Sequence, residues 1–173
     1  MTDPLTGLAR VNALPESEAR AALLTCCGST RWAERMTAQR PFTSAAQMHA
    51  DGDRLWFALE PTDWLEAFAH HPRIGERDLA APKFAATAEQ STREQSGMNA
   101  ATEEQRRAFI EGNAEYEKKF GHVFLICATG KSAAEMLEQL RVRLNNDART
   151  ELANAAREQS LITRLRLERM LTA

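Results

Sequence analysis

The chain has 173 residues, enough for one domain with a sizeable core, and its 43% apolar and 27% charged residues are typical of a globular protein. Its 22 Lys and Arg against 24 Asp and Glu give a net charge of −2, so the charge gives no reason to expect a nucleic acid or a membrane surface as partner. No apolar run approaches the ~20 residues that a membrane-spanning helix needs.

The chain ends and the cysteines favour the cytoplasm. The first residues lack the basic and apolar regions of a signal peptide, and the last three, Leu171 to Ala173, are not a peroxisomal signal. Cys26 and Cys27 are adjacent, and with Cys127 they make a poor disulfide framework, so we expect a reducing compartment.

Two short helices are predicted near the N-terminus. Residues 15–27 have acidic residues early and apolar residues later, and Gly28 is a suitable stop. Residues 31–39 have apolar side chains at helical spacing. Both segments therefore read as amphipathic helices.

The next segment reads as two pieces. Ser44 is a candidate cap for a helix through residue 49, and the sequence Asp51-Gly52-Asp53 indicates a break or a kink. Residues 55–60 then resume an apolar face before Pro61.

A helix capped by Thr62 is expected to end abruptly at His71. Pro72 bars its continuation and pushes His71 toward an extended conformation. His71 therefore lies at a helix exit, where its side chain can point into a cleft. The apolar face of this helix consists of Trp64, Leu65 and Phe68.

A short polar helix is predicted further along. Ser91, Glu94 and Gln95 are spaced i, i+3 and i+4, so they share one face, and Gly97 reads as the stop. Together with His71 they supply a hydroxyl, a carboxylate, an amide and an imidazole that can converge on a small molecule.

The second half carries sharper helix signals. Thr102 with Gln105 forms a capping box that opens a helix closed by Gly121, and Ser132 with Glu135 forms a second one. The sequence at 145–147 breaks the second helix, and a long helix is expected from about residue 148 to the end.

Residues 122–128 form the one convincing extended run, which we expect to be buried and to line the site with backbone groups. Residues 1–173 are therefore predicted to form a single all-α domain, a compact bundle of about seven or eight helices with one buried extended segment.

Arg166 lies on the stripe of the last helix that begins apolar. One interpretation is that its side chain extends to solvent or pairs with a glutamate of a neighbouring helix. The other is that its guanidinium binds a carboxylate or a urea-like carbonyl at two points. Arg164 and Arg169 point elsewhere and read as surface charges. The stripe consists of Leu152, Ala155, Gln159, Ile162 and Arg166.

Several motifs in the right order resemble the family of OHCU decarboxylases, which act on 2-oxo-4-hydroxy-4-carboxy-5-ureidoimidazoline (OHCU), an intermediate of urate breakdown. The motifs are His71-Pro72-Arg73-Ile74-Gly75, Ser91-x-x-Glu94-Gln95, Asn113-x-x-Tyr116-x-x-x-Phe120-Gly121, the run from Phe124 to Ala128, and Ile162-x-x-Leu165-Arg166-Leu167. They cover most of the chain from about residue 60 onward.

The resemblance implies an all-helical, usually homodimeric enzyme that converts OHCU to S-allantoin without metal or organic cofactor. It implies that His71 and Glu94 are catalytic, and that Pro72 holds the histidine in place. The residues it assigns to substrate binding are Pro72, Ser91, Gln95, Arg166, Phe124 and Ile126.

Other interpretations stay open at this stage. A histidine before proline is often a helix-end residue with no further role, and His70 reads that way. Glu94 can pair with Arg93 or Lys83 at the surface, and Gln95 can be solvated. A metal site at the histidine pair is not expected, because adjacent histidines diverge by ~100° on a helix and no metal-ligand spacing is present.

Cys127 is flanked by residues that read as core, which argues against a nucleophilic role. Two other functions remain: a non-catalytic helical module that binds ureides or partners, and a hydrolase of a related urate intermediate.

Overall fold

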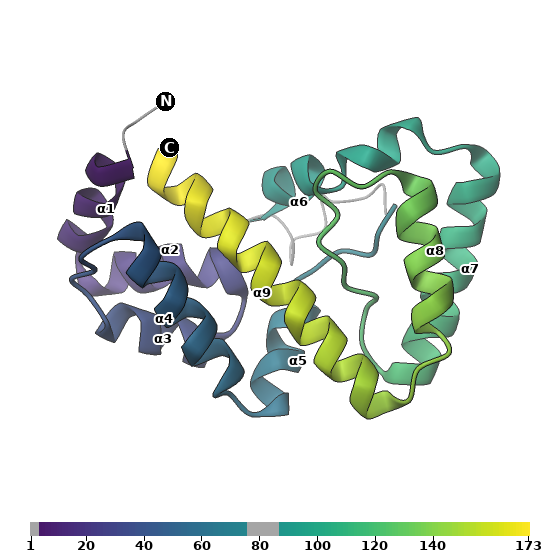
Figure 1. Cartoon of the computed structure of the whole chain (residues 1–173), viewed down its shortest axis with the longest axis horizontal. Coiled ribbons are helices and arrows are strands. Elements are labelled where there is room, and N and C mark those ends of the chain that lie inside the picture. The colour runs from purple at the N-terminus through teal and green to yellow at the C-terminus, as the bar shows by residue number, and fades with distance from the viewer. Residues whose placement is uncertain (1–3, 76–86) are drawn as a thin grey trace. The chain divides into compact units, whose positions relative to one another are not determined.

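The computed structural model describes residues 4–75 and 87–173 of the chain, with side chains described from residue 6 onward. Nine α-helices and one 3-10 helix are present in these residues, and no strand is found there, which confirms the all-α prediction (Figure 1). The predicted number of seven or eight helices was too low. None of the described helices has the apolar length needed to span a bilayer.

The chain divides into two compact units, residues 1–67 with 160–173 and residues 68–159. The prediction of one domain over residues 1–173 stays a prediction. The helices are α1 (Pro4–Ala13), α2 (Glu16–Cys27), α3 (Thr30–Ala38), α4 (Ala45–Phe57), α5 (Pro61–Ala69), α6 (Ala88–Glu94), the 3-10 helix η2 (Ser96–Ala100), α7 (Glu103–Phe120), α8 (Ala133–Arg143) and α9 (Ala148–Thr172).

In the first unit α2 packs on α3, α3 on α4, and α4 on α1 (Figure 1). Helix α1 was not predicted. Helix α2 ends at Gly28, whose φ of 89° is left-handed, and Ser29 accepts a hydrogen bond from the backbone of Trp32 to cap α3. Both predicted helices are confirmed. The sequence was enough to predict them because residues within one turn fix their boundaries.

Two predictions in the first unit were wrong. Of the break or kink expected at residues 51–53, the break does not occur, since α4 runs unbroken to Phe57. Trp32 Nε1 donates to the Gly52 carbonyl at 2.9 Å, and a Cβ added to Gly52 would lie at an ordinary contact distance of 3.5 Å from the Trp32 ring, so the indole packs against the helix at Gly52. Helix α5 begins at Pro61 and not after Thr62, as expected for a proline in the first helical position.

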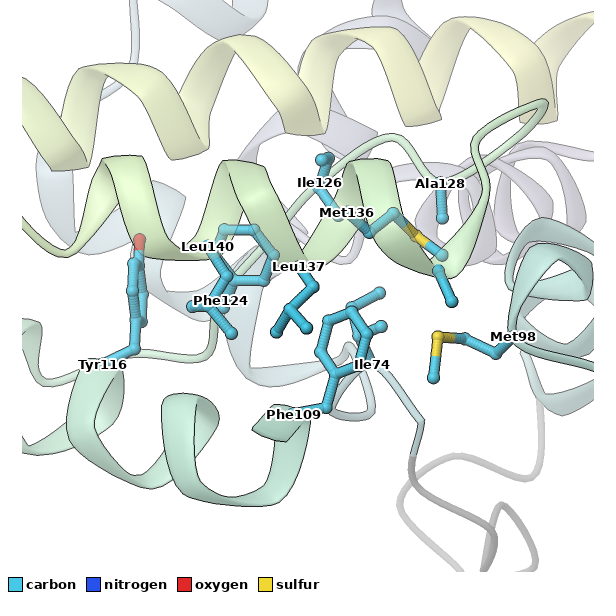
Figure 2. Close-up of a cluster of buried hydrophobic side chains, with 11 residues drawn as sticks. Ile74, Met98, Phe109, Tyr116, Phe124, Ile126, Ala128, Met136, Leu137 and Leu140 are labelled. Atoms are coloured by element: carbon cyan, nitrogen blue, oxygen red, sulfur yellow. The ribbon is translucent and has the colours of Figure 1, made fainter. Parts of the chain in front are cut away.

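The second unit has an apolar core between α7, α8 and the segment at 122–128 (Figure 2). Both capping boxes are present, and Gly121 ends α7 with a φ of 77°. Residues 122–128, the extended segment of the prediction, form no helix or strand and are buried from residue 124 onward, so the predicted burial is confirmed. The core consists of Ile74, Met98, Phe109, Tyr116, Phe124, Ile126, Ala128, Ala133, Met136, Leu137 and Leu140.

Gly97 does not stop α6, contrary to the prediction. Helix α6 ends at Glu94, and Gly97 lies inside η2, which packs against α6 and α8. A Cβ on Gly97 would collide with the carbonyl oxygen of Lys131. The glycine is therefore required by a close backbone approach and not by a helix end.

Candidate active site

His71 lies just beyond α5, in the backbone position that the sequence predicts. Its N–H donates to the Phe68 carbonyl at 3.0 Å, and Pro72 follows, so the helix cannot continue. The imidazole is 6% exposed, and its Nε2 lies 2.8 Å from Oε1 of Gln159 in α9. His70 is exposed. The two neighbouring histidines therefore have different surroundings, and only His71 is buried.

Helix α6 places Ser91 and Glu94 on its buried side. Both side chains are at least nine-tenths buried. Ser91 Oγ makes no hydrogen bond within the described part of the chain. A buried hydroxyl without a partner is unusual in a folded protein and is a good candidate to bind a ligand.

The interpretation that Glu94 pairs with Arg93 at the surface is wrong. Glu94 is 6% exposed, whereas Arg93 pairs with Glu89 on the exposed side of α6. Lys83, the other partner considered, lies outside the described residues. The Glu94 carboxylate is close enough to Cys127 to act on its thiol electrostatically.

Gln95 connects α6 to the His-Pro-Arg-Ile-Gly motif. Its Oε1 accepts the Gly75 N–H at 3.0 Å, and Gly75 has a left-handed φ of 80°. The side-chain oxygen of Gln95 thus accepts a hydrogen bond from the backbone, which contradicts the interpretation of Gln95 as a solvated side chain. Asn113 Nδ2 donates to the Ile74 carbonyl at 3.1 Å, so the motif is held on both sides of its turn.

The extended segment is held in place through its backbone. Cys127 N–H donates to Glu158 Oε2, Lys131 Nζ donates to the Cys127 carbonyl, and Arg143 Nη1 donates to the Leu125 carbonyl, each at 2.7 Å. The side chains of Phe124 and Ile126 lie in the apolar core (Figure 2). These two side chains are therefore not placed to bind a polar ligand.

Cys127 is a poor nucleophile in these surroundings. Burial raises the pKa of its thiol, and the carboxylates of Glu158 and Glu94 raise the pKa further, against the opposing effect of Lys131. The thiolate is therefore disfavoured, in agreement with the core character of its flanks.

Arg166 belongs to the first unit, whereas the other candidate residues belong to the second. Its side chain is 3% exposed, and Nη1 donates to the Thr25 carbonyl at 3.3 Å, so the interpretation that it extends to solvent is wrong. Arg164 is exposed, as predicted, and Arg169 is half-buried. Burying a guanidinium raises the free energy of the fold unless the group is hydrogen-bonded. The burial of Arg166 fits a binding role and a structural role equally well.

A pocket of about 230 Å³ lies beside the His-Pro-Arg-Ile-Gly motif in the second unit. It is formed by residues of α7 and by Arg73 to Gly75, and none of the predicted site residues lines it. No group of three or more His, Cys, Asp and Glu residues is placed to hold a metal ion in the described ranges.

Sequence reasoning assigned no role to Gln159. The signal that was present is its position as an uncharged polar residue in the apolar stripe of α9. Gln159 is fully buried and bonded to His71, 88 residues away in sequence. Its neighbour Glu158 bonds the extended segment, so one turn of α9 supports two parts of the candidate site.

Comparisons with known proteins place the chain beside proteins of urate degradation. The family model for OHCU decarboxylase matches residues 12–168. The chain is 40% identical over 148 residues to the uric acid degradation bifunctional protein TTL of Arabidopsis thaliana, covering 84% of this chain and 45% of that protein. It is 29% identical over 130 residues to the 2-oxo-4-hydroxy-4-carboxy-5-ureidoimidazoline decarboxylase of Amia calva, covering 75% of this chain and 73% of that protein.

A crystal structure of OHCU decarboxylase in the presence of (S)-allantoin resembles the chain with a TM-score of 0.74 at 36% identity, covering 87% of this chain and 96% of that one. The chain spans less than half the length of three bifunctional relatives that it matches, 45%, 27% and 26% of them.

Proposed function

Because the chain belongs to the OHCU decarboxylase family, we propose that it removes CO₂ from 2-oxo-4-hydroxy-4-carboxy-5-ureidoimidazoline to give (S)-allantoin in urate degradation. The observation that carries this proposal is the family match over residues 12–168, because it includes every residue assigned to the reaction. The burial of His71, Ser91 and Glu94 in one unit supports it.

The chemistry of the substrate explains why no electron-accepting cofactor is part of the proposal. OHCU carries a hydroxyl and a carboxylate on one carbon, next to an imine-like carbon. When the bond to the carboxylate breaks, its electron pair moves into the neighbouring C–N system and CO₂ leaves. The nitrogen that receives this electron pair takes up a proton. The resulting enol-like intermediate then loses the hydroxyl proton and gains a proton on carbon, so one proton is taken up overall. The protein supplies orientation, proton transfer and a single handedness of the product.

Each polar residue then has a role that its chemistry permits. The Glu94 carboxylate accepts a hydrogen bond from the substrate hydroxyl and holds the leaving carboxylate perpendicular to the ring. His71 transfers a proton as the enol-like intermediate collapses, since an imidazole with an ordinary pKa of ~6.5 both accepts and donates near neutral pH. Pro72 fixes the backbone of His71. Ser91 supplies a hydroxyl, for which its unpartnered Oγ is the supporting observation.

The remaining binding roles involve the other predicted residues. The Gln95 side chain and the backbone at Phe124 and Ile126 contact the substrate, and Arg166 binds ring or ureido oxygens through its guanidinium. These assignments rest on the family motifs.

Three further properties come with the proposal. The enzyme works without a metal ion or organic cofactor, forms a homodimer, and acts in the cytoplasm. Light scattering coupled to size-exclusion chromatography tests the dimer: a mass of one chain at working concentration would contradict it.

The decisive assay uses freshly generated OHCU. Since OHCU decays spontaneously to racemic allantoin, the measurement is the enantiomeric excess of allantoin together with the rate of CO₂ release. We expect an excess of the S form at a rate above the uncatalysed one. A non-catalytic binding module would give racemic product at the uncatalysed rate, and a hydrolase would consume OHCU without releasing CO₂.

The two adjacent histidines offer a matched test of the proton-transfer role. We expect His71→Asn to fold but to abolish the enantiomeric excess, and His70→Asn to keep it, because only His71 is buried and bonded to Gln159. Circular dichroism checks the fold of both variants. Wild-type enantiomeric excess in the His71 variant would refute the assignment.

A further inference from the structure

The hydrogen bond between His71 and Gln159 has a direct consequence for the imidazole. Its atoms, His71 Nε2 and Gln159 Oε1, are 2.8 Å apart, a normal length for an N–H···O bond. Gln159 is 0% exposed and His71 6%, so bulk water does not compete for this contact. Both residues belong to the unit of residues 68–159.

An amide oxygen only accepts hydrogen bonds, so Nε2 must carry the proton. In a neutral imidazole the other ring nitrogen, Nδ1, then has the lone pair. In the imidazolium form Nε2 keeps its proton and its bond to Gln159, and Nδ1 carries the additional one. A complete cycle of proton uptake and release thus leaves the bond to Gln159 unchanged.

We propose that Gln159 is a positioning residue that fixes His71 as the Nε2–H tautomer, so that Nδ1 is the atom which takes up and releases the proton during decarboxylation. The part that concerns the reaction rests on the proposed function. The part that concerns the tautomer does not.

The surroundings of Gln159 are suited to this role. The preceding residue, Glu158, accepts the Cys127 N–H at 2.7 Å, which attaches the same turn of α9 to the extended segment. On the other side the backbone of His71 is fixed by its bond to the Phe68 carbonyl and by Pro72. Both partners are therefore attached to backbone that is itself held, as orientation of a catalytic group requires.

The type of side chain is also informative. A carboxylate at this place would accept the same hydrogen bond but would also favour the charged imidazolium. The neutral amide orients the ring without adding a charge to it.

The tautomer is measured directly by NMR of protein labelled with ¹⁵N in its histidines, because the two ring nitrogens have different shifts in the two tautomers. The chain has four histidines, and the His71 signals are those lost in His71→Asn. We expect the wild type to show a proton on Nε2 and a lone pair on Nδ1. A wild-type His71 with its proton on Nδ1 would overturn the proposal, whatever the variants do.

Two substitutions test the role of Gln159. Gln159→Met keeps the length of the side chain but has no acceptor oxygen, so the His71 proton should become shared between both nitrogens. Gln159→Glu keeps the acceptor and should keep the proton on Nε2. Arg157→Ala, on the exposed side of α9, is the control and should leave the spectrum unchanged. An unchanged tautomer in Gln159→Met would overturn the proposal.

Activity gives the second readout. We expect kcat of Gln159→Met to fall about tenfold or more with KM little changed, since general acid–base catalysis contributes roughly 10²–10⁴-fold and only part of it is lost. Gln159→Glu should recover part of this loss. Equal kcat in the wild type and Gln159→Met would refute the part of the proposal that gives Gln159 a role in the reaction. Racemic product from the wild type would refute the proposed function. The NMR measurement would still decide whether Gln159 fixes the Nε2–H tautomer of His71.

Discussion

Glu151→Ala is expected to destabilise the unit of residues 68–159 strongly, because it leaves the Arg143 guanidinium buried without its counter-charge. Glu151 is 0% exposed and Arg143 5%. Glu151 Oε1 accepts from Arg143 Nε at 2.7 Å and from the Tyr116 hydroxyl, and Oε2 accepts from Asn146 Nδ2 at 2.8 Å. Asn154 Nδ2 also donates to Oε2, at 3.5 Å, so one carboxylate accepts hydrogen bonds from four side chains.

The expected magnitude follows from this burial. Removing one partner of a buried ion pair costs about 3–5 kcal/mol, whereas an exposed pair contributes about 0–1 kcal/mol. For a chain of this size a loss of about 3–5 kcal/mol corresponds to a fall in Tm of roughly 6–20 °C. The loss also reaches the candidate site, since Arg143 donates to the Leu125 carbonyl in the extended segment.

The assay is urea and thermal unfolding followed by circular dichroism, with Glu89→Ala as the matched control. Glu89 also pairs with an arginine, Arg93, but both side chains are more than half exposed. We expect the control to change Tm by no more than a few degrees. Equal, small shifts for Glu151→Ala and Glu89→Ala would refute the reasoning.

The difference between wild type and Glu151→Ala should also depend on pH. Burial raises the pKa of Glu151, but the hydrogen bonds from Arg143, Tyr116 and Asn146 outweigh it and leave the pKa below its ordinary value of 4.5. A carboxyl group with a depressed folded-state pKa stabilises the fold fully above its unfolded pKa, and this stabilisation is lost as the pH falls through the folded value. The stability gap should therefore be widest above pH 4.5 and narrow in more acidic solution.

Three further outcomes are expected. Arg166→Ala should lower kcat/KM roughly ten- to a hundredfold, mainly through KM, because a charge-assisted contact is worth ~1.5–3 kcal/mol. The control Arg164→Ala, at an exposed position, should leave kcat/KM unchanged. The reverse pattern in steady-state kinetics would contradict the assignment. Gly97→Ala should lower the free energy of unfolding by about 1–3 kcal/mol, because its Cβ meets the Lys131 carbonyl, while exposed Ser96→Ala should be neutral in urea titrations. EDTA should leave activity intact, and a loss restored by one added metal would show that the cofactor-free mechanism is wrong.

The helix boundaries that were correctly predicted depend on neighbours in sequence. Thr102 with Gln105 and Ser132 with Glu135 form their capping boxes within one turn. Gly121 ends α7 because its left-handed φ is open to glycine at no steric cost. Such features need no tertiary partner, so the local sequence is enough to identify them.

The boundaries that were wrongly predicted depend on distant residues. Gly52 lies inside α4 because the Trp32 indole packs on it and donates to its carbonyl, although the same glycine between two aspartates normally indicates a turn. Gly97 lies in η2 against the backbone of Lys131. In both places tertiary packing outweighs the local preference.

The candidate site divides in the same way. From the sequence came the position of His71 at a helix exit, the shared helical face of Ser91 and Glu94, and the family motifs that give these residues a proposed role. Their burial, the unpartnered Ser91 hydroxyl and the bond from His71 to Gln159 came only from the tertiary structure.

The physical reason is the range of the interactions. Capping, proline exclusion and helical periodicity act over four residues or fewer, so the sequence by itself determined the all-α fold class and most helices of this protein. Only the folded chain brings Gln159 to His71 across 88 residues and buries Arg143 against Glu151, because long-range packing decides which polar groups leave water and must find partners inside.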